Sequence, residues 1–192
     1  MDNRLYRTLM MIAVALTVAW LGWSIYDSLW GGRQPGDSAY FAANTLFDDE
    51  RYERALEEYE SALADAPDHL HALRGKARSL LKLERYDEAL AAFNEAIARD
   101  PEFPAAYANR GILHDQMGEY RKALADYEKA LVLDPELAEG PHWMTRFLRL
   151  QPEKPPTIEA RAGYLRQELE KPESERVLRV PEVDEAQRPY KM

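Results

Sequence analysis

The chain repeats one pattern of apolar and small residues three times, at a fixed spacing of 34 residues. The seven positions in the middle copy are Tyr86, Ala89, Leu90, Phe93, Ala96, Ile97 and Pro101. Moving 34 residues in either direction finds residues of the same kinds, from Tyr52 to Pro67 and from Tyr120 to Pro135. Apolar residues at steps of three and four lie on one face of a helix, and proline ends a helix because it lacks a backbone N–H. Each copy therefore predicts one amphipathic helix.

A second amphipathic segment precedes each copy. Ala43, Ala77 and Gly111 take the same place in it, where a small residue lets another helix come close. The predicted helix pairs cover residues 38–47 with 52–64, 70–83 with 86–99, and 105–117 with 120–133. A nonrepeating helical bundle does not account for a fixed period, so the pattern indicates a repeat architecture.

These residues resemble the tetratricopeptide repeat family, whose repeats have this length and this order of small, aromatic and proline residues. The third copy fits the family best, through Tyr107, Gly111, Ala123, Tyr127, Ala130 and Pro135. The departures are Ala39 and Leu73 in place of an aromatic residue, Lys76 and Arg110 in place of leucine, and His114 in place of an aromatic residue or leucine. The resemblance implies an all-α solenoid of helix hairpins, with three repeats and a capping helix.

The repeat domain is expected to span residues 37–150, with repeats at about 36–69, 70–103 and 104–137 and a capping helix at 138–150. The apolar face of that last helix would consist of Trp143, Met144, Phe147 and Leu148. It is expected to cover the end of the stack, since each repeat buries its face only against neighbours. A helix that binds a partner is the alternative. The flanking segments are a short N-terminal segment (1–7), a transmembrane anchor (8–29), two linkers (30–36 and 151–156), a helix (157–171) and an extended or disordered tail (172–192).

Residues 8–26 form an uncharged, mostly apolar run of 19 residues. As a helix this run would extend about 28 Å, close to the thickness of the bilayer hydrocarbon. Trp20, Trp23, Tyr26 and Trp30 cluster at its far end, as aromatic residues do at a membrane interface. The run predicts one transmembrane helix. A cleaved signal peptide is the alternative, although no small-residue cleavage site follows closely.

The charges that flank this run predict its orientation. Arg4 and Arg7 precede it and only Arg33 follows it closely, which favours a cytoplasmic N-terminus. The repeats would then lie on the opposite side. A short uncleaved anchor and a compact architecture suggest a bacterial inner membrane, with the repeats in the periplasm.

Composition narrows the functional classes. The chain has 34 acidic and 25 basic residues and a net charge of -9, which argues against general nucleic-acid binding. It has no cysteine, which excludes disulfides and thiolate metal sites. The four histidines, His69, His71, His114 and His142, show no metal-ligand spacing, and His114 is expected to be packed in the repeat core. No phosphate-binding loop or nucleophile motif is present. The sequence thus predicts no enzyme, metal site or cofactor.

The resemblance implies a concave groove, lined by the first helix of each repeat, that holds a peptide or a helix of another protein. Its candidate residues are Tyr40, Phe41, Asn44, Phe47, His71, Arg74, Arg78, Lys82, Asn109, Ile112 and Arg146. Arg74, Arg78 and Lys82 are four residues apart and form one basic stripe. The stripe is either a solvated face whose arginines pair with nearby acids or a site for a carboxylate or an acidic peptide. On the second interpretation, substituting both arginines weakens partner binding without unfolding the domain.

One specialised activity of similar proteins is not predicted. Relatives that bind chaperone tails use a carboxylate clamp of lysine, asparagine and arginine. This chain has Tyr40, Gly75 and Ala105 at clamp positions, keeps Asn44, and has Asn109 in place of the arginine.

The sequence thus predicts a membrane-anchored scaffold or assembly factor that binds other proteins in its groove. The alternative is a permanent structural or accessory subunit of a membrane complex. Neither the partner nor the oligomeric state follows from the residues. The tail after Pro172 is either a disordered terminus or a recognition segment, and a recognition segment could occupy the chain's own groove or a neighbour's.

Overall fold

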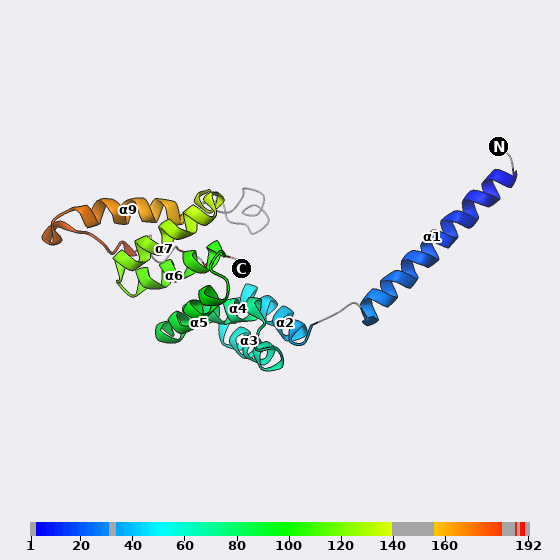
Figure 1. The fold of residues 1–192 in the computed structure, drawn as a ribbon, viewed down its shortest axis with the longest axis horizontal. Helices are drawn as coiled ribbons and strands as arrows, with labels where there is room; N and C mark the ends of the chain where they lie inside the picture. The colour runs from blue at the N-terminus through cyan, green and yellow to red at the C-terminus, as the bar shows by residue number, and fades with distance from the viewer. Residues whose placement is uncertain (1–2, 31–33, 140–155, 182–186, 188, 191–192) are drawn as a thin grey trace.

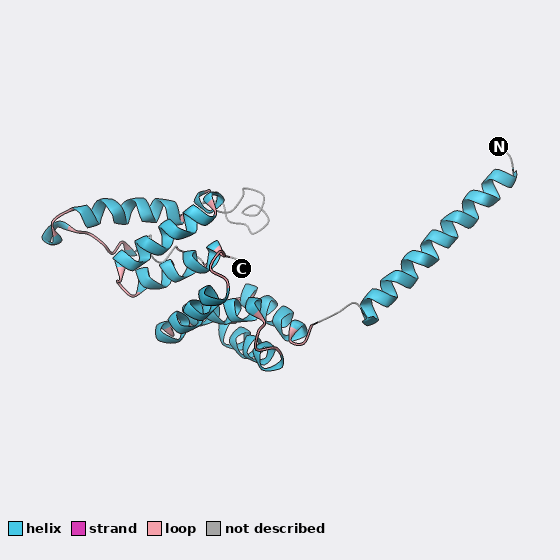
Figure 2. Ribbon diagram, viewed as in Figure 1, coloured by secondary structure: helices cyan, strands magenta, loops and turns pink. Residues whose placement is uncertain are grey.

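The computed structural model describes residues 3–30, 34–139, 156–181, 187 and 189–190. Within these residues all regular secondary structure is helical, as Figure 2 shows. The predicted all-α fold is therefore confirmed.

Six helices form the three predicted pairs. They are α2 (Asp37–Asp48) with α3 (Tyr52–Asp65), α4 (Leu70–Lys82) with α5 (Tyr86–Arg99), and α6 (Pro104–Gln116) with α7 (Tyr120–Leu133). The two helices of each pair pack on each other, and α3 packs on α4 as α5 packs on α6. The pairs thus stack into a solenoid, which appears in Figure 1 as a continuous run from α2 to α7.

The 34-residue period also sets the turn inside each pair. Glu50, Glu84 and Gly118 follow the first helices and have φ values of 60°, 58° and 75°. A residue in this left-handed region ends a helix by letting its backbone turn back. The same turn therefore recurs in each repeat, whether or not its residue is glycine.

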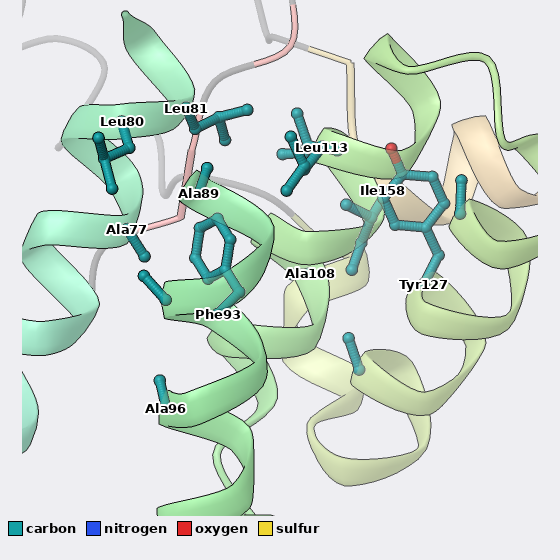
Figure 3. Close-up of a cluster of buried hydrophobic side chains, with 14 of the residues drawn as sticks. Ala77, Leu80, Leu81, Ala89, Phe93, Ala96, Ala108, Leu113, Tyr127 and Ile158 are labelled. Atoms are coloured by element: carbon teal, nitrogen blue, oxygen red, sulfur yellow. The ribbon is translucent and has the colours of Figure 1, made fainter. Parts of the chain in front are cut away.

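The core follows the repeated aromatic and alanine positions. The side chains of Tyr59, Phe93 and Tyr127 are fully buried, one in each repeat, and Figure 3 shows the last two between alanines and leucines of α4, α5 and α6. Two glycines make room for the rings. A Cβ atom on Gly75 would lie 2.2 Å from the Tyr59 ring, and one on Gly111 would lie 2.6 Å from the Tyr127 ring.

A further helix, α9 (Ile158–Glu170), covers α7. Its side chains Ile158, Ala162 and Leu165 join the core of the repeats. The hydroxyl of Thr157 caps the helix by accepting a hydrogen bond from the N–H of Ala160 at 3.2 Å. The expected capping helix at 138–150 lies almost wholly outside the described residues. The described part of the chain has a 3₁₀ turn, η1 (Pro135–Ala138), ends at residue 139 and begins again at residue 156, just before α9.

The remaining long helix, α1 (Asn3–Trp30), stands apart from the repeats in Figure 1. Its segment Tyr6–Asp27 has 22 residues, a mean hydropathy of 1.9, and no buried residue. It is long and apolar enough to cross a membrane, although a secretory signal sequence has the same properties.

Candidate functional site

The first helices of the three pairs, α2, α4 and α6, carry all but one of the predicted groove residues. We call the side of the repeats that these residues form the inner face. In it α2 contacts α4, and α4 contacts α6. The remaining candidate, Arg146, lies outside the described residues.

Aromatic rings gather at the N-terminal end of the inner face. The centroid of the Tyr40 ring lies 5.3 Å from that of Phe41, 4.9 Å from that of His69 and 6.1 Å from that of His71. Phe41 is 61% exposed, and His71 is also exposed. Partial burial and the charge of Arg74 lower the pKa of His71, which favours the neutral form of its imidazole at neutral pH.

His69 has a structural role beside these rings. Its Nδ1 accepts a hydrogen bond from the N–H of Ala72 at 3.1 Å and so caps α4. Its Nε2 lies 3.2 Å from a carboxylate oxygen of Asp37, at the start of α2. The histidine therefore ties the first repeat to the second.

The basic stripe on α4 is largely buried. Arg74 is only 2% exposed, its Nη2 lies 2.5 Å from a carboxylate oxygen of Asp100, and its guanidinium stacks 3.6 Å from the centroid of the Phe103 ring. Such an ion pair and stacking contact fix the side chain. Arg74 thus pairs with a nearby acid, as one interpretation of the stripe expects, but it is not on a solvated face.

Arg78 is also buried, at 6% exposure, and stacks 4.3 Å from the centroid of the Phe47 ring. Its Nη1 donates to the backbone carbonyl of Tyr190 at 3.4 Å. Its Nε has no hydrogen-bond partner in the part of the chain that the structure describes. Lys82 is exposed and lies 5.6 Å from the ring of Tyr52.

The packing of Tyr59 explains why the chaperone-tail clamp does not fit here. Its hydroxyl donates to Oδ1 of Asn44 at 2.7 Å, which engages the one clamp residue that the chain keeps. Its ring also fills the space beside Gly75, so an asparagine at that position would collide with it.

The C-terminal end of the described chain lies on the inner face. The N–H of Tyr190 donates to Oδ1 of Asn109 at 2.7 Å, and the carbonyl of Tyr190 accepts from Nδ2 of Asn109 at 3.1 Å. Asn109 itself is fully buried. One amide side chain thus holds both polar groups of one backbone residue, although the two residues are 81 positions apart. The sequence predicts Asn109 as a groove residue but contains no periodic signal that identifies Tyr190.

A buried polar cluster lies beside this contact. Nε and Nη2 of Arg161 donate to the two carboxylate oxygens of Asp115 at 2.7 and 2.8 Å. The amide of Gln187 donates to Asp115 at 3.2 Å, and the hydroxyl of Tyr127 lies 3.2 Å from both Asp115 and Gln187. Burial and the charge of Asp115 raise the pKa of Tyr127 well above 10, so its hydroxyl stays protonated. Arg161 and Gln187 lie outside the repeats, and sequence reasoning does not find them.

His114 is buried, as its position in the repeat predicts. Its Nδ1 lies 2.6 Å from a carboxylate oxygen of Glu119, while Asp126 accepts two hydrogen bonds from Arg110 at 2.7 Å. These contacts tie α6 to α7. Among the residues that the structure describes, no group of three His, Asp or Glu side chains is placed to hold a metal ion.

Comparison with known proteins identifies the fold. A sequence profile described as tetratricopeptide repeat matches residues 40–104 and 75–138. The second TPR domain of Spaghetti (RPAP3), solved with an HSP90 peptide, is 30% identical, with a TM-score of 0.50 over 53% of this chain and 94% of that one. The TPR2B domain of yeast Sti1, solved as a pHsp70 complex, is 26% identical, with a TM-score of 0.50 over 60% and 91%.

The first TPR domain of human RPAP3 is 22% identical, with a TM-score of 0.52 over 62% of this chain and 91% of that one, and at this identity it supports the fold alone. Among curated proteins, none matches the chain significantly. The repeated phrase, the stacked helix pairs and the profile match over more than half of the sequence agree: the chain belongs to the tetratricopeptide repeat family.

Proposed function

We propose that this chain is a membrane-anchored protein-interaction module that binds extended segments of other proteins on its inner face. The observation that carries the proposal is the pair of hydrogen bonds between Asn109 and the backbone of Tyr190. On the Tyr190 side these bonds use only main-chain groups, so the backbone of any extended segment could form them with the Asn109 amide. Similar TPR domains at 30% and 26% identity, solved with an HSP90 peptide and with pHsp70, support a peptide ligand. We assign the chain no catalytic role.

The aromatic end of the inner face offers a second contact area. Phe41 is exposed beside Tyr40 and His71, and a ligand that runs from Asn109 toward α2 would cover these rings. Apolar contact there would add affinity that backbone hydrogen bonds do not provide. The positive charge of Arg78, which already donates to the backbone carbonyl of Tyr190, would favour an acidic side chain in the ligand.

The segment Tyr6–Asp27 supports the membrane part of the proposal. Its orientation rests on the flanking arginines, which favour a cytoplasmic N-terminus and a periplasmic repeat domain in a bacterial inner membrane. In that setting the module would recruit partners or help to assemble a complex at the membrane. A permanent subunit of a membrane complex would have the same anchor. The two roles differ in whether the bound partner stays associated with the chain or exchanges.

Site-specific photocrosslinking tests the proposal. The full chain, in its native membrane, carries benzoylphenylalanine in place of Phe41, and crosslinked proteins are identified by mass spectrometry. The matched control carries the same group in place of Val132, which is 77% exposed on α7, outside the inner face. We expect specific protein adducts from position 41 only. The same adducts at both positions, or none at position 41, would reject the proposal. One adduct at fixed stoichiometry favours the subunit, and several exchangeable adducts favour the scaffold.

A further inference from the structure

Tyr190 is held by its side chain as well as by its backbone. The hydroxyl of Tyr190 accepts a hydrogen bond from the N–H of Ile158 at 3.3 Å, at the start of α9. The same hydroxyl lies 3.4 Å from the carbonyl oxygen of Leu137, to which it donates. Both partners are main-chain groups held by helices, so their positions do not depend on a rotamer. Burial raises the pKa of Tyr190, which keeps the hydroxyl protonated and able to donate.

A second recognition point lies three residues earlier. The side chain of Gln187 is buried, with its amide nitrogen against Asp115 and its amide oxygen against the hydroxyl of Tyr127. A glutamine can satisfy both neighbours because its amide has both a donor and an acceptor. A carboxylate at the same place would face Asp115 and be repelled. The site thus favours a neutral amide followed, three residues later, by a tyrosine.

The segment that leads to this site is held mainly by polar contacts. Between α9 and Gln187, the backbone of Val177 donates to Glu168 at 2.9 Å and accepts from Tyr164, and the carbonyl of Leu178 accepts from Arg161 at 3.0 Å. Val177 is exposed, and Leu178 is only partly buried. Each such bond contributes only modest net stability, even where a charged Glu168 or Arg161 takes part, because the released groups bind water instead.

The segment also leaves space beneath it. A cavity of about 550 Å³ is bordered by Arg179, Pro181 and Gln187 of the segment and by the C-terminal ends of α4 and α6. A different peptide could therefore carry larger side chains than this one along the same path. Arg179, Pro181 and Gln187 border this cavity without filling it.

We infer that the inner face between α4, α6 and α9 is a binding site for an extended peptide in which a glutamine precedes a tyrosine by three residues. The chain's own Gln187 and Tyr190 occupy this site until such a segment of a partner protein displaces them. This inference rests on the proposed peptide-binding function and specifies the ligand of the same face.

Competition within the chain has a measurable consequence. A tethered segment reaches an effective concentration of about millimolar at its own site. A partner peptide in solution must therefore compete against it, and its apparent affinity falls by the fraction of molecules in which the site is free. Loosening the chain's own segment should raise the affinity for an added peptide at least tenfold.

Fluorescence anisotropy tests this with a labelled synthetic peptide of residues 179–192 as the probe. The full chain in detergent is compared with a release variant, Gln187→Ala/Tyr190→Ala, and with the same variant carrying Asn109→Ala in addition. We expect the release variant to bind the probe at least tenfold more tightly than the unaltered chain, and Asn109→Ala to remove most of this gain. A probe whose tyrosine is replaced by alanine should bind at least tenfold more weakly.

Equal probe binding by the unaltered chain and the release variant would overturn the inference, as would no binding by a release variant whose thermal unfolding is unchanged. If the release variant unfolds at a lower temperature than the unaltered chain, Tyr190→Phe replaces it, because this change removes only the hydroxyl. Tyr190→Phe should give a smaller increase in probe affinity, and no increase would count against the inference. Dimers that sedimentation detects in the unaltered chain but not in the release variant would show that a second copy supplies the segment, which also overturns it. Crosslinked partners at position 41 without probe binding would reject this inference alone, whereas probe binding without such partners would reject the proposed function alone.

Discussion

Positions 75 and 109 are equivalent residues of successive repeats, 34 apart, yet they do opposite things. Gly75 has no side chain, and the ring of Tyr59 fills the space next to it. Asn109 fills its own place with an amide that holds the backbone of Tyr190. One position of the repeat can therefore serve the core in one copy and recognition in the next.

The role of Gly75 is testable. Gly75→Ala is expected to lower the free energy of unfolding by about 1–3 kcal/mol, because the added carbon would overlap the Tyr59 ring and force it to move. The matched control is Gly163→Ala in α9, where nothing lies within 4 Å of the added carbon. Helix propensity should make the control more stable by about 1 kcal/mol or less. Thermal unfolding of the full chain in detergent measures both variants. If Gly75→Ala leaves the stability unchanged, the packing argument is contradicted.

At the scale of the helix, α4 shows what sequence patterns can and cannot reveal. Its core face was predictable because Ala77 and Leu80 recur with the period, and the basic stripe was predictable as a spacing of four. The partners of that stripe were not predictable. Asp100 and Phe103 lie in the connection between α5 and α6, and Tyr190 lies far along the chain. Contacts that occur once leave no period in a sequence. Docking of the tail in its own groove was therefore only one of several alternatives, and the residues that make the contact appear only in three dimensions.

The contacts of Arg74 predict that it stabilises the fold. Arg74→Ala is expected to lower the free energy of unfolding by about 1–3 kcal/mol, since it leaves Asp100 unpaired and removes the stacking on Phe103. Lys82→Ala, on the same stripe but exposed, should change it by about 0.5 kcal/mol or less. Chemical denaturation followed by circular dichroism compares them. If Arg74→Ala proves as mild as Lys82→Ala, the ion pair has no structural role.

The attachment of the tail to α9 should depend on pH. Lys171 and the N–H of Val177 lower the pKa of Glu168 below its ordinary value of 4.5. A lowered pKa in the folded state means that ionised Glu168 stabilises the fold above that value, and this stabilisation is lost as the pH falls through the folded pKa. Glu168→Gln should therefore lower the unfolding temperature at pH 7 and have a smaller effect near pH 3.5. A difference that is the same at both pH values would contradict this assignment.

The whole molecule has a repeat domain with α9 packed on its last pair and a separate apolar helix at the other end, as Figure 1 shows. The chain returns from α9 to the inner face, so Tyr190 lies against α4 and α6 in the middle of the solenoid. The C-terminal region thus has two roles: α9 covers the last repeat, and Tyr190 occupies the inner face.

Membrane attachment through α1 is a prediction at this scale. The full chain should resist extraction by alkaline carbonate, and a variant without residues 1–30 should become extractable. Protease added outside spheroplasts should digest the repeats while the N-terminus stays protected. Recovery of a mature chain that begins after α1 would instead identify this helix as a signal sequence, and protected repeats would reverse the orientation.

The short connection between α1 and α2 has a consequence for how partners are found. Six residues separate Trp30 from Asp37, and an extended chain of that length spans about 20 Å. An anchored module on such a tether would search by lateral diffusion within a thin layer above the bilayer. Proteins in the same membrane would meet it far more often than freely diffusing ones. Membrane location would therefore limit the set of partners, in addition to the specificity of the binding face.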